Sequence, residues 1–251
     1  MSEHDTPHPI YRLVEEESDR VIIAAHEING FFVDPDRVKP ESVLILGSAQ
    51  EPVRVGEDLT DVELRVVNPT GARVGSYYIG RVGLRSELPG GARAGQAGFL
   101  ATFYGYTCPH PAAGAIWRRW ASEDPLRHGE WMEYPAEAHE SWLHVVQNSW
   151  FTAGRTATRY DTRTLCTIDG SKILNESSFY CELGESVNGV GGYFGSTLDG
   201  LADCLTSSTA SGNRFDVLWR ESAPSRQRMG SSLTKSIMGI LKEFDIDVTL
   251  R

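Results

Sequence analysis

The sequence predicts two domains, a mainly β (α+β) domain over residues 1–155 and an α/β domain over residues 163–251. Up to about residue 109, short apolar or alternating runs separated by Gly and Pro are typical of antiparallel strands. The last ninety or so residues alternate strand and helix patterns, which favours a small parallel or mixed sheet with helices packed on it. Residues 152–163 are small and polar without apolar periodicity, so we expect the domain boundary there.

Five segments of the N-terminal part have the pattern of strands. They are residues 21–25, 42–47, 61–67, 76–84 and 98–106. The turn sequence Asn-Pro-Thr-Gly at 68–71 separates the third from the fourth, and the Gly-rich residues 89–95 predict a flexible connection. Strands of this kind predict an antiparallel sheet or an open barrel.

Helical spacing begins after Pro111. Residues 112–122 place Ile116, Trp117 and Trp120 on one face, and residues 141–150 have the pattern of a second helix. In the C-terminal part we expect strands at 165–168, 215–219 and 245–250, and helices at 177–185, 198–205 and 231–244. The last helix carries its apolar residues on a single face.

Charge and composition restrict the function. The net charge is −10, of which residues 163–251 contribute −2 and the remainder −8. No basic stripe is present that could neutralise phosphates, which argues against direct nucleic-acid binding. An acidic protein suits a basic partner, although solubility alone is an equally good explanation of the charge.

Two features of the sequence bear on the compartment. The N-terminus is polar, with no secretory signal pattern, and no run approaches the ~20 apolar residues of a membrane helix. Four scattered cysteines form no CxxC pair, so we expect them to be buried and reduced. A cytoplasmic location follows as the expectation.

The segment with the most chemical information is the predicted helix 198–205. Ser196 or Thr197 is a plausible N-cap, and Asp199 and Asp203 lie four residues apart on one face. Two neighbouring carboxylates repel each other unless a cation meets them, so this face suits Arg and Lys side chains. The alternative is an ordinary solvated helix edge.

The pattern around this helix resembles the signature of the barstar (barnase-inhibitor) family. It reads aromatic-aromatic-Gly-x-x-Leu-Asp-x-Leu-x-Asp-Cys-Leu-Thr from Tyr193 to Thr206. Thr-Ile-Asp-Gly at 167–170, Phe-Asp-Val-Leu-Trp-Arg at 215–220 and Asp-Ile-Asp-Val-Thr-Leu at 245–250 match the family's strands in the same order. The resemblance covers about residues 163–251 and implies a three-stranded parallel sheet with packed helices. No family is recognised in the N-terminal domain.

The resemblance implies an inhibitor that enters a ribonuclease active site with this acidic helix. Asp203 would be the main mimic of an RNA phosphate and Asp199 a second charged contact. The remaining positions carried over as partner-binding flank the helix: Tyr193, Gly195, Thr197 and Thr206. No catalytic residue, cofactor or metal is implied.

Several positions depart from the family pattern. Ala202 and Ser208 stand where tryptophans are frequent, and residues 207–212 are expected to form a small polar loop. Met238 or Gly239 falls where the family presents an acidic contact. These departures bear on the identity of the target and the affinity for it, because they remove peripheral anchors.

Other motifs are weaker candidates. The Gly-rich residues 189–195 do not follow an apolar strand, which disfavours a phosphate loop. The seven histidines all lie before residue 145 without metal-ligand spacing, and the Trp-rich stretch 117–150 is more typical of core than of a ligand platform.

The sequence thus predicts a cytoplasmic immunity protein that binds a barnase-like ribonuclease or nuclease toxin. One alternative is a binding module for a non-ribonuclease partner, with the N-terminal domain in targeting or regulation. An enzyme within residues 1–155 is disfavoured because no catalytic spacing is present.

Overall fold

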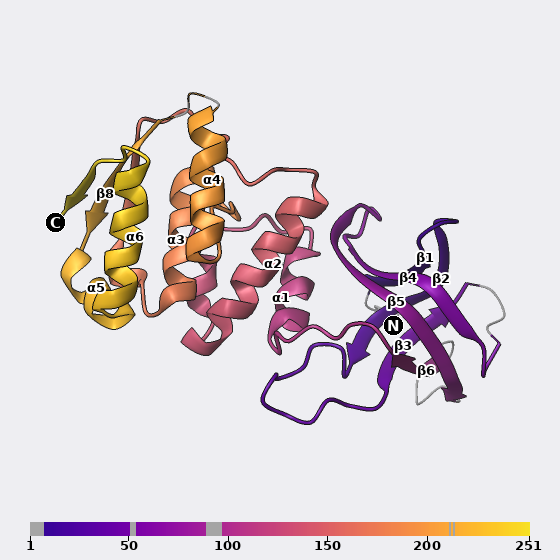
Figure 1. Cartoon of the computed structure of the whole chain (residues 1–251). Coiled ribbons are helices and arrows are strands. Elements are labelled where there is room, and N and C mark those ends of the chain that lie inside the picture. The colour runs from indigo at the N-terminus through magenta and orange to yellow at the C-terminus, as the bar shows by residue number, and fades with distance from the viewer. Residues whose placement is uncertain (1–7, 51–53, 89–96, 211, 213) are drawn as a thin grey trace, which may run out of the picture. The chain divides into compact units, whose positions relative to one another are not determined.

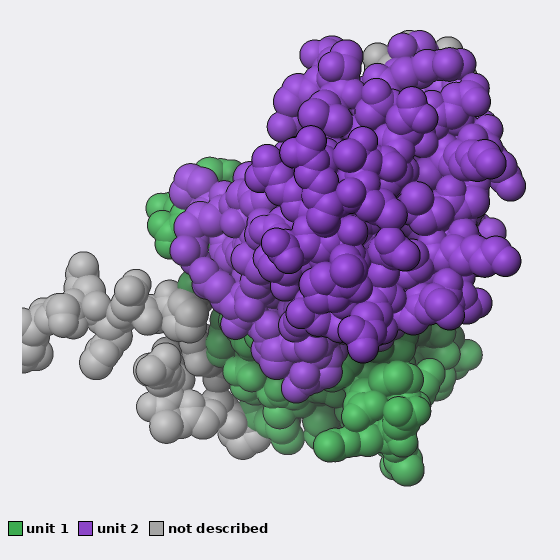
Figure 2. Space-filling view, turned by 90° about the vertical axis from the view of Figure 1, so that its left-hand side faces the viewer, with its two compact units in different colours: residues 1–124 green, residues 125–251 purple. Residues whose placement is uncertain are grey.

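The computed structural model describes residues 8–50, 54–88, 97–210, 212 and 214–251 (Figure 1). The connection expected at 89–95 lies outside these residues. The chain divides into two compact units, residues 1–124 and 125–251, which Figure 2 colours separately. This division falls ahead of the boundary expected at 155–163, since helix α2 (His139–Thr152) packs against α3 (Glu176–Asn188) in the second unit. No helix in the described ranges is long and apolar enough to cross a membrane.

The first unit is a closed six-stranded antiparallel barrel in the order β1-β2-β3-β6-β5-β4. Its strands are β1 (Tyr11–Glu15), β2 (Arg20–Asn29), β3 (Val43–Ala49), β4 (Asp58–Val67), β5 (Arg73–Leu88) and β6 (Ala97–Phe103). The prediction of antiparallel strands is confirmed, but the strands form a closed barrel where an antiparallel sheet or an open barrel was expected. Closure depends on β1, which pairs with both β2 and β4.

Helix α1 (Ala113–Trp120) packs on the barrel through one large side chain. The Trp117 indole donates a hydrogen bond of 2.7 Å to the Tyr77 hydroxyl. Gly75 in β5 leaves the space that this ring fills, because a Cβ there would lie 2.3 Å from the Trp117 ring. The predicted helix after Pro111 is therefore part of the barrel's core.

The second unit contains the parallel sheet β7-β8-β9, which confirms the predicted three-stranded arrangement. Its strands are β7 (Leu165–Asp169), β8 (Asp216–Arg220) and β9 (Val248–Leu250). Helices α3, α4 (Leu198–Ala210) and α6 (Ser231–Glu243) occupy the predicted positions. Strand β9 is shorter than expected, because Asp245 has a positive φ of 56° and turns the chain before the strand begins.

Helix α5 (Ser222–Met229) was not predicted, because it has no apolar periodicity. Its buried residues are small serines, and the Ser225 hydroxyl accepts a hydrogen bond of 3.1 Å from the Trp219 indole. Small side chains let α5 approach Gly170 closely, where a Cβ would lie 2.3 Å from the Glu221 carbonyl. Close packing of small residues leaves no hydrophobic pattern in the sequence.

Helix α3 is buried on all sides along residues 178–187, between strand β7 and helix α2. Its side chains also close the outer edge of the sheet. The Ser186 hydroxyl donates to the Thr167 carbonyl at 2.7 Å, and the Glu182 carboxylate accepts from the Asp169 amide at 2.9 Å. Because these two groups of β7 are occupied in this way, they are not available to pair with another chain.

Candidate functional site

The acidic helix α4 begins with a side-chain cap. The Thr197 hydroxyl accepts a hydrogen bond of 3.1 Å from the Gly200 amide, one of the free amides of the first turn. Of the two caps considered from the sequence, the structure therefore selects Thr197. The spacing of Leu198, Leu201 and Leu205 predicts that they form the opposite, buried face of the helix. The structure buries Leu201 and Leu205, whereas Leu198 is partly exposed. This anchoring fixes which face of α4 reaches solvent.

Asp199 and Asp203 both lie on the exposed face of α4. Neither carboxylate forms an ion pair with any residue that the structure describes. Their charges act on nearby hydroxyls. Burial is the main reason why the pKa values of Tyr180 and Tyr193 are raised, and the charge of Asp199 adds to this effect at Tyr180 and that of Asp203 at Tyr193. Two like charges four residues apart weaken a helix slightly, so a cationic partner would relieve the repulsion.

The loop before α4 packs tightly against its first turn. Gly195 has a φ of 94°, and a Cβ there would lie 2.8 Å from the Leu201 amide nitrogen. This position requires glycine for both its backbone angle and its close contact. Gly195 is thus buried and shapes the site rather than presenting atoms to a partner.

Tyr193, expected beside the helix, is only 4% exposed. Burial raises the pKa of its hydroxyl, and a hydrogen bond with Ser196 opposes this effect. The ring of Phe151, at the end of α2, lies edge-on to Tyr193 with the ring centroids 5.4 Å apart. A residue from outside the predicted inhibitor domain therefore covers one of the expected contact positions.

The two threonines that flank the site are both exposed, but their hydroxyls serve the helix. Thr197 caps its start, and the Thr206 hydroxyl donates to the Ala202 carbonyl at 2.8 Å. The structure therefore brings the six expected positions together around α4 and places four of them at the surface. Asp199 and Asp203 are the charged members of this group.

The departures from the family pattern have different structural consequences. Residues 207–210 continue α4, so the expectation of a loop from 207 onward was wrong. Ser208 is buried; its hydroxyl donates to the Cys204 carbonyl at 2.6 Å and accepts from the Arg159 amide at 3.0 Å. This position therefore supports the segment before β7 and is not a lost surface anchor. Ala202 is half-buried on α4, and Gly239 is exposed on α6.

Two buried carboxylates on α3 gave no signal in the sequence, since Glu on a helix is normally exposed. The Glu185 carboxylate accepts a hydrogen bond of 2.7 Å from the Gly129 amide. Glu182 lies 3.4 Å from the Lys172 ammonium, and burial raises the pKa of its carboxyl. The Glu185 contact holds the residues after Asp124 against α3, and the Glu182 contact ties α3 to the turn that follows β7.

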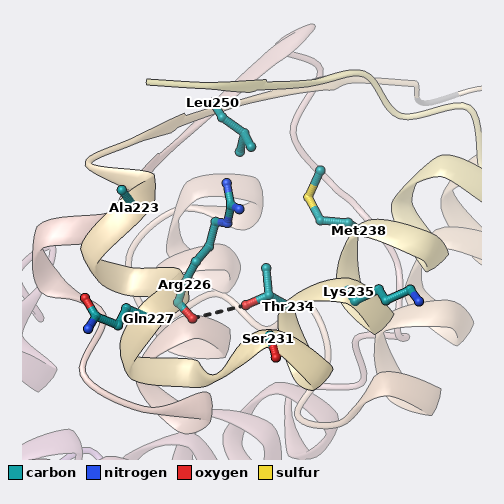
Figure 3. A pocket seen from close by; sticks show the side chains of 8 residues that line it. All are labelled: Ala223, Arg226, Gln227, Ser231, Thr234, Lys235, Met238 and Leu250. Carbon is teal, nitrogen blue, oxygen red and sulfur yellow. Dashed lines mark hydrogen bonds between the residues drawn. The ribbon is translucent and has the colours of Figure 1, made fainter.

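A separate pocket of about 600 Å³ lies between α5, α6 and β9 (Figure 3). Arg226 and Lys235 contribute basic groups to its lining, and Met238 and Leu250 contribute apolar ones. No residue of α4 lines it, so the pocket is distinct from the acidic surface. Met238, one of the two candidates for the missing acidic contact, belongs to this pocket.

The cysteines and most of the tryptophans that the sequence analysis considered are part of the buried core. The four cysteines are all buried and form no disulfide, and Trp117, Trp131, Trp142 and Trp150 are core residues. The described ranges contain no group of three or more His, Cys, Asp or Glu side chains arranged to hold a metal ion.

Comparison with known proteins agrees with the geometry of the second unit. Residues 163–249 match the model of the Barstar family, described as barstar (barnase inhibitor). No family model matches the N-terminal part, and the comparison with curated proteins gave no significant match. The match includes the whole of β7, α4 and β8, and it ends one residue before the end of β9. Residues 163–249 of the chain are therefore similar to the Barstar family.

Proposed function

We propose that the C-terminal unit inhibits a barnase-like ribonuclease by presenting α4 to its active site. The observation that carries this proposal is the pair of exposed carboxylates, Asp199 and Asp203, on a capped helix within the family match. A nuclease active site binds phosphate with cationic side chains, and a carboxylate offers them charge-assisted hydrogen bonds. The protein would then act by occupying the site and not by catalysis.

The charge of the chain supports fast association with such a target. The net charge of −10 opposes that of a basic nuclease, and opposite fields accelerate encounter at low ionic strength. The barnase–barstar pair is itself a standard example of this steering and of binding hot spots. We also propose that the protein acts as a cytoplasmic immunity protein. The four cysteines support this, because they are buried and form no disulfide.

The experiment titrates the full chain against barnase as the probe and measures both ribonuclease activity and the dissociation constant. The double variant Asp199→Asn/Asp203→Asn removes two charges while keeping the side-chain shape. Since charge-assisted pairs in a desolvated interface are worth several kcal/mol, we expect it to weaken binding by a hundredfold or more.

The matched control is Glu137→Gln/Glu140→Gln, which removes the same charge from exposed positions at the start of α2. It should change the association rate slightly and leave the dissociation rate unaltered. No inhibition by the unaltered protein would refute the proposal. Full inhibition by the Asp199/Asp203 variant would refute the role of α4.

A second candidate function is binding of a basic protein that is not a ribonuclease, with the N-terminal unit in targeting or regulation. The burial of Tyr193 under Phe151 favours it, because one position expected to contact the nuclease is covered. Lack of barnase inhibition, together with a co-purified basic partner whose binding requires Asp199 and Asp203, would support this candidate over the first.

A further inference from the structure

The end of helix α2 presents an exposed aromatic side chain beside the acidic helix. Phe151 is 43% exposed although it is a large apolar residue. Its ring contacts Tyr193 in an edge-on arrangement, with an interplanar angle of 62°. Tyr193 in turn reaches α4, because a Cβ on Gly200 would lie 3.4 Å from the Tyr193 hydroxyl oxygen. Phe151, Tyr193 and the first turn of α4 therefore lie next to one another in this order, from an apolar side chain to an acidic helix.

Hydrogen bonds hold the end of α2 and the chain after it in place. The Asn188 side-chain amide donates to the carbonyls of Tyr193 (2.7 Å) and Thr158 (3.1 Å), and its oxygen accepts from the Tyr160 amide (2.8 Å). The Arg159 amide donates to Ser208 on α4. The residues after α2 are thus tied to both α3 and α4, so Phe151 has a defined position relative to Asp199 and Asp203. Both α2 and these residues belong to the second compact unit, which Figure 2 shows in purple.

Phe151 lies outside the family match, which begins at residue 163. The contact with Tyr193 buries only part of the Phe151 ring, and the rest of this apolar side chain meets solvent. Aromatic residues are enriched at the centres of protein interfaces. Within the match, the position that often carries an aromatic on the acidic helix is occupied here by Ala202. The chain therefore lacks an aromatic side chain on α4 and has one beside it on α2.

We propose that Phe151 is a partner contact, and that the surface for the basic partner extends from the acidic face of α4 onto the end of α2. This inference rests on the proposed function and names a residue from outside the family domain as a determinant of which nuclease is bound. The charged pair on α4 selects a basic partner, and Phe151 meets an apolar patch beside that partner's cationic site.

The test compares three substitutions, Phe151→Ala, Phe151→Lys and Phe151→Glu, in binding to barnase as the probe. Loss of a buried aromatic anchor should raise the dissociation constant about tenfold or more in Phe151→Ala. Lys at this position should slow association with a basic partner relative to Glu, and the difference should fall at high salt. Both charged variants suffer any loss of the Tyr193 contact equally, so their ratio reports proximity to the partner and not folding.

Met132 provides the matched control. It is 44% exposed and lies near the opposite end of α2, where Trp131 contacts His139. Twelve residues of helix separate His139 from Phe151, a rise of about 18 Å, which is beyond the Debye length in physiological salt. Met132→Ala should bind as the unaltered protein does. Met132→Lys and Met132→Glu should differ only slightly in association rate, and far less than the Lys and Glu variants of Phe151 do.

The possible outcomes separate the two proposals. Unaltered protein that inhibits barnase, together with Phe151 variants that bind as tightly as it does, would overturn the inference and leave the proposed function intact. Failure of the unaltered protein to inhibit barnase would overturn both. A loss in Phe151→Ala without any difference between the Lys and Glu variants would assign Phe151 a supporting role for Tyr193 and refute direct contact.

Discussion

Replacement of Gly195 by alanine should destabilise the acidic surface through a defined steric conflict. The new Cβ would lie 2.8 Å from the Leu201 amide nitrogen, 3.0 Å from its Cα and 3.2 Å from the Gly200 carbonyl carbon. All three are backbone atoms, so the contact cannot be relieved by rotating a side chain. The positive φ adds about 1 kcal/mol, and overpacking against fixed atoms adds about 1–3 kcal/mol. We therefore expect a loss of about 3 kcal/mol in the free energy of unfolding.

Gly154→Ala is the matched control for this change. Gly154 also has a positive φ, 72°, but a Cβ there would have no neighbour within 4 Å. The free energy of unfolding of Gly154→Ala should fall only by the backbone contribution of about 1 kcal/mol. Urea titrations compared at constant m-value measure both losses, and hydrogen exchange of the α4 amides locates them. Equal losses in the two variants would refute the argument, because the close contact with Leu201 would then contribute nothing.

Two further predictions concern polar groups on α3. Asn188→Asp replaces the amide group that donates to the Tyr193 and Thr158 carbonyls with an acceptor, so the free energy of unfolding should fall by about 2–4 kcal/mol in urea titrations. A fall below about 0.5 kcal/mol would contradict the bridging role. Glu182 has its pKa raised by burial, so the folded state binds its proton more tightly than the unfolded state does. Its contribution is therefore most favourable below pH 4.5, the ordinary value, and is lost as the pH rises through the raised pKa. The stability of Glu182→Gln relative to the unaltered protein should increase over that range, and a difference that is independent of pH would contradict this assignment.

Elements with a strong hydrophobic period could be predicted from the sequence. The helix α6 has a single apolar face, and the alternation of residues 61–67 indicated the strand β4, although Glu63 on its polar side is buried. Elements built from small residues or from long-range pairing could not. Helix α5 packs through serines, and β1 is recognisable only by the two strands it joins, β2 and β4.

The candidate site shows the same division. Asp199 and Asp203 could be assigned to one face of a helix because their spacing of four residues matches the helical period. Their exposure and lack of ion-pair partners within the described ranges depend on which residues surround α4. Gly195 was placed at the site by resemblance. The reason why glycine is required there is a backbone contact with Leu201, which exists only in the folded chain.

The sequence by itself determined the two-part organisation, the parallel α/β character of the C-terminal part and the acidic face of α4, because these features depend on local periodicity and on the order of motifs. Only the tertiary structure decided that the barrel closes, that α2 belongs with the C-terminal unit and that Phe151 lies on Tyr193. These are contacts between residues far apart in the chain. No local pattern records such contacts, since many different side chains can satisfy the same packing and hydrogen-bonding requirement.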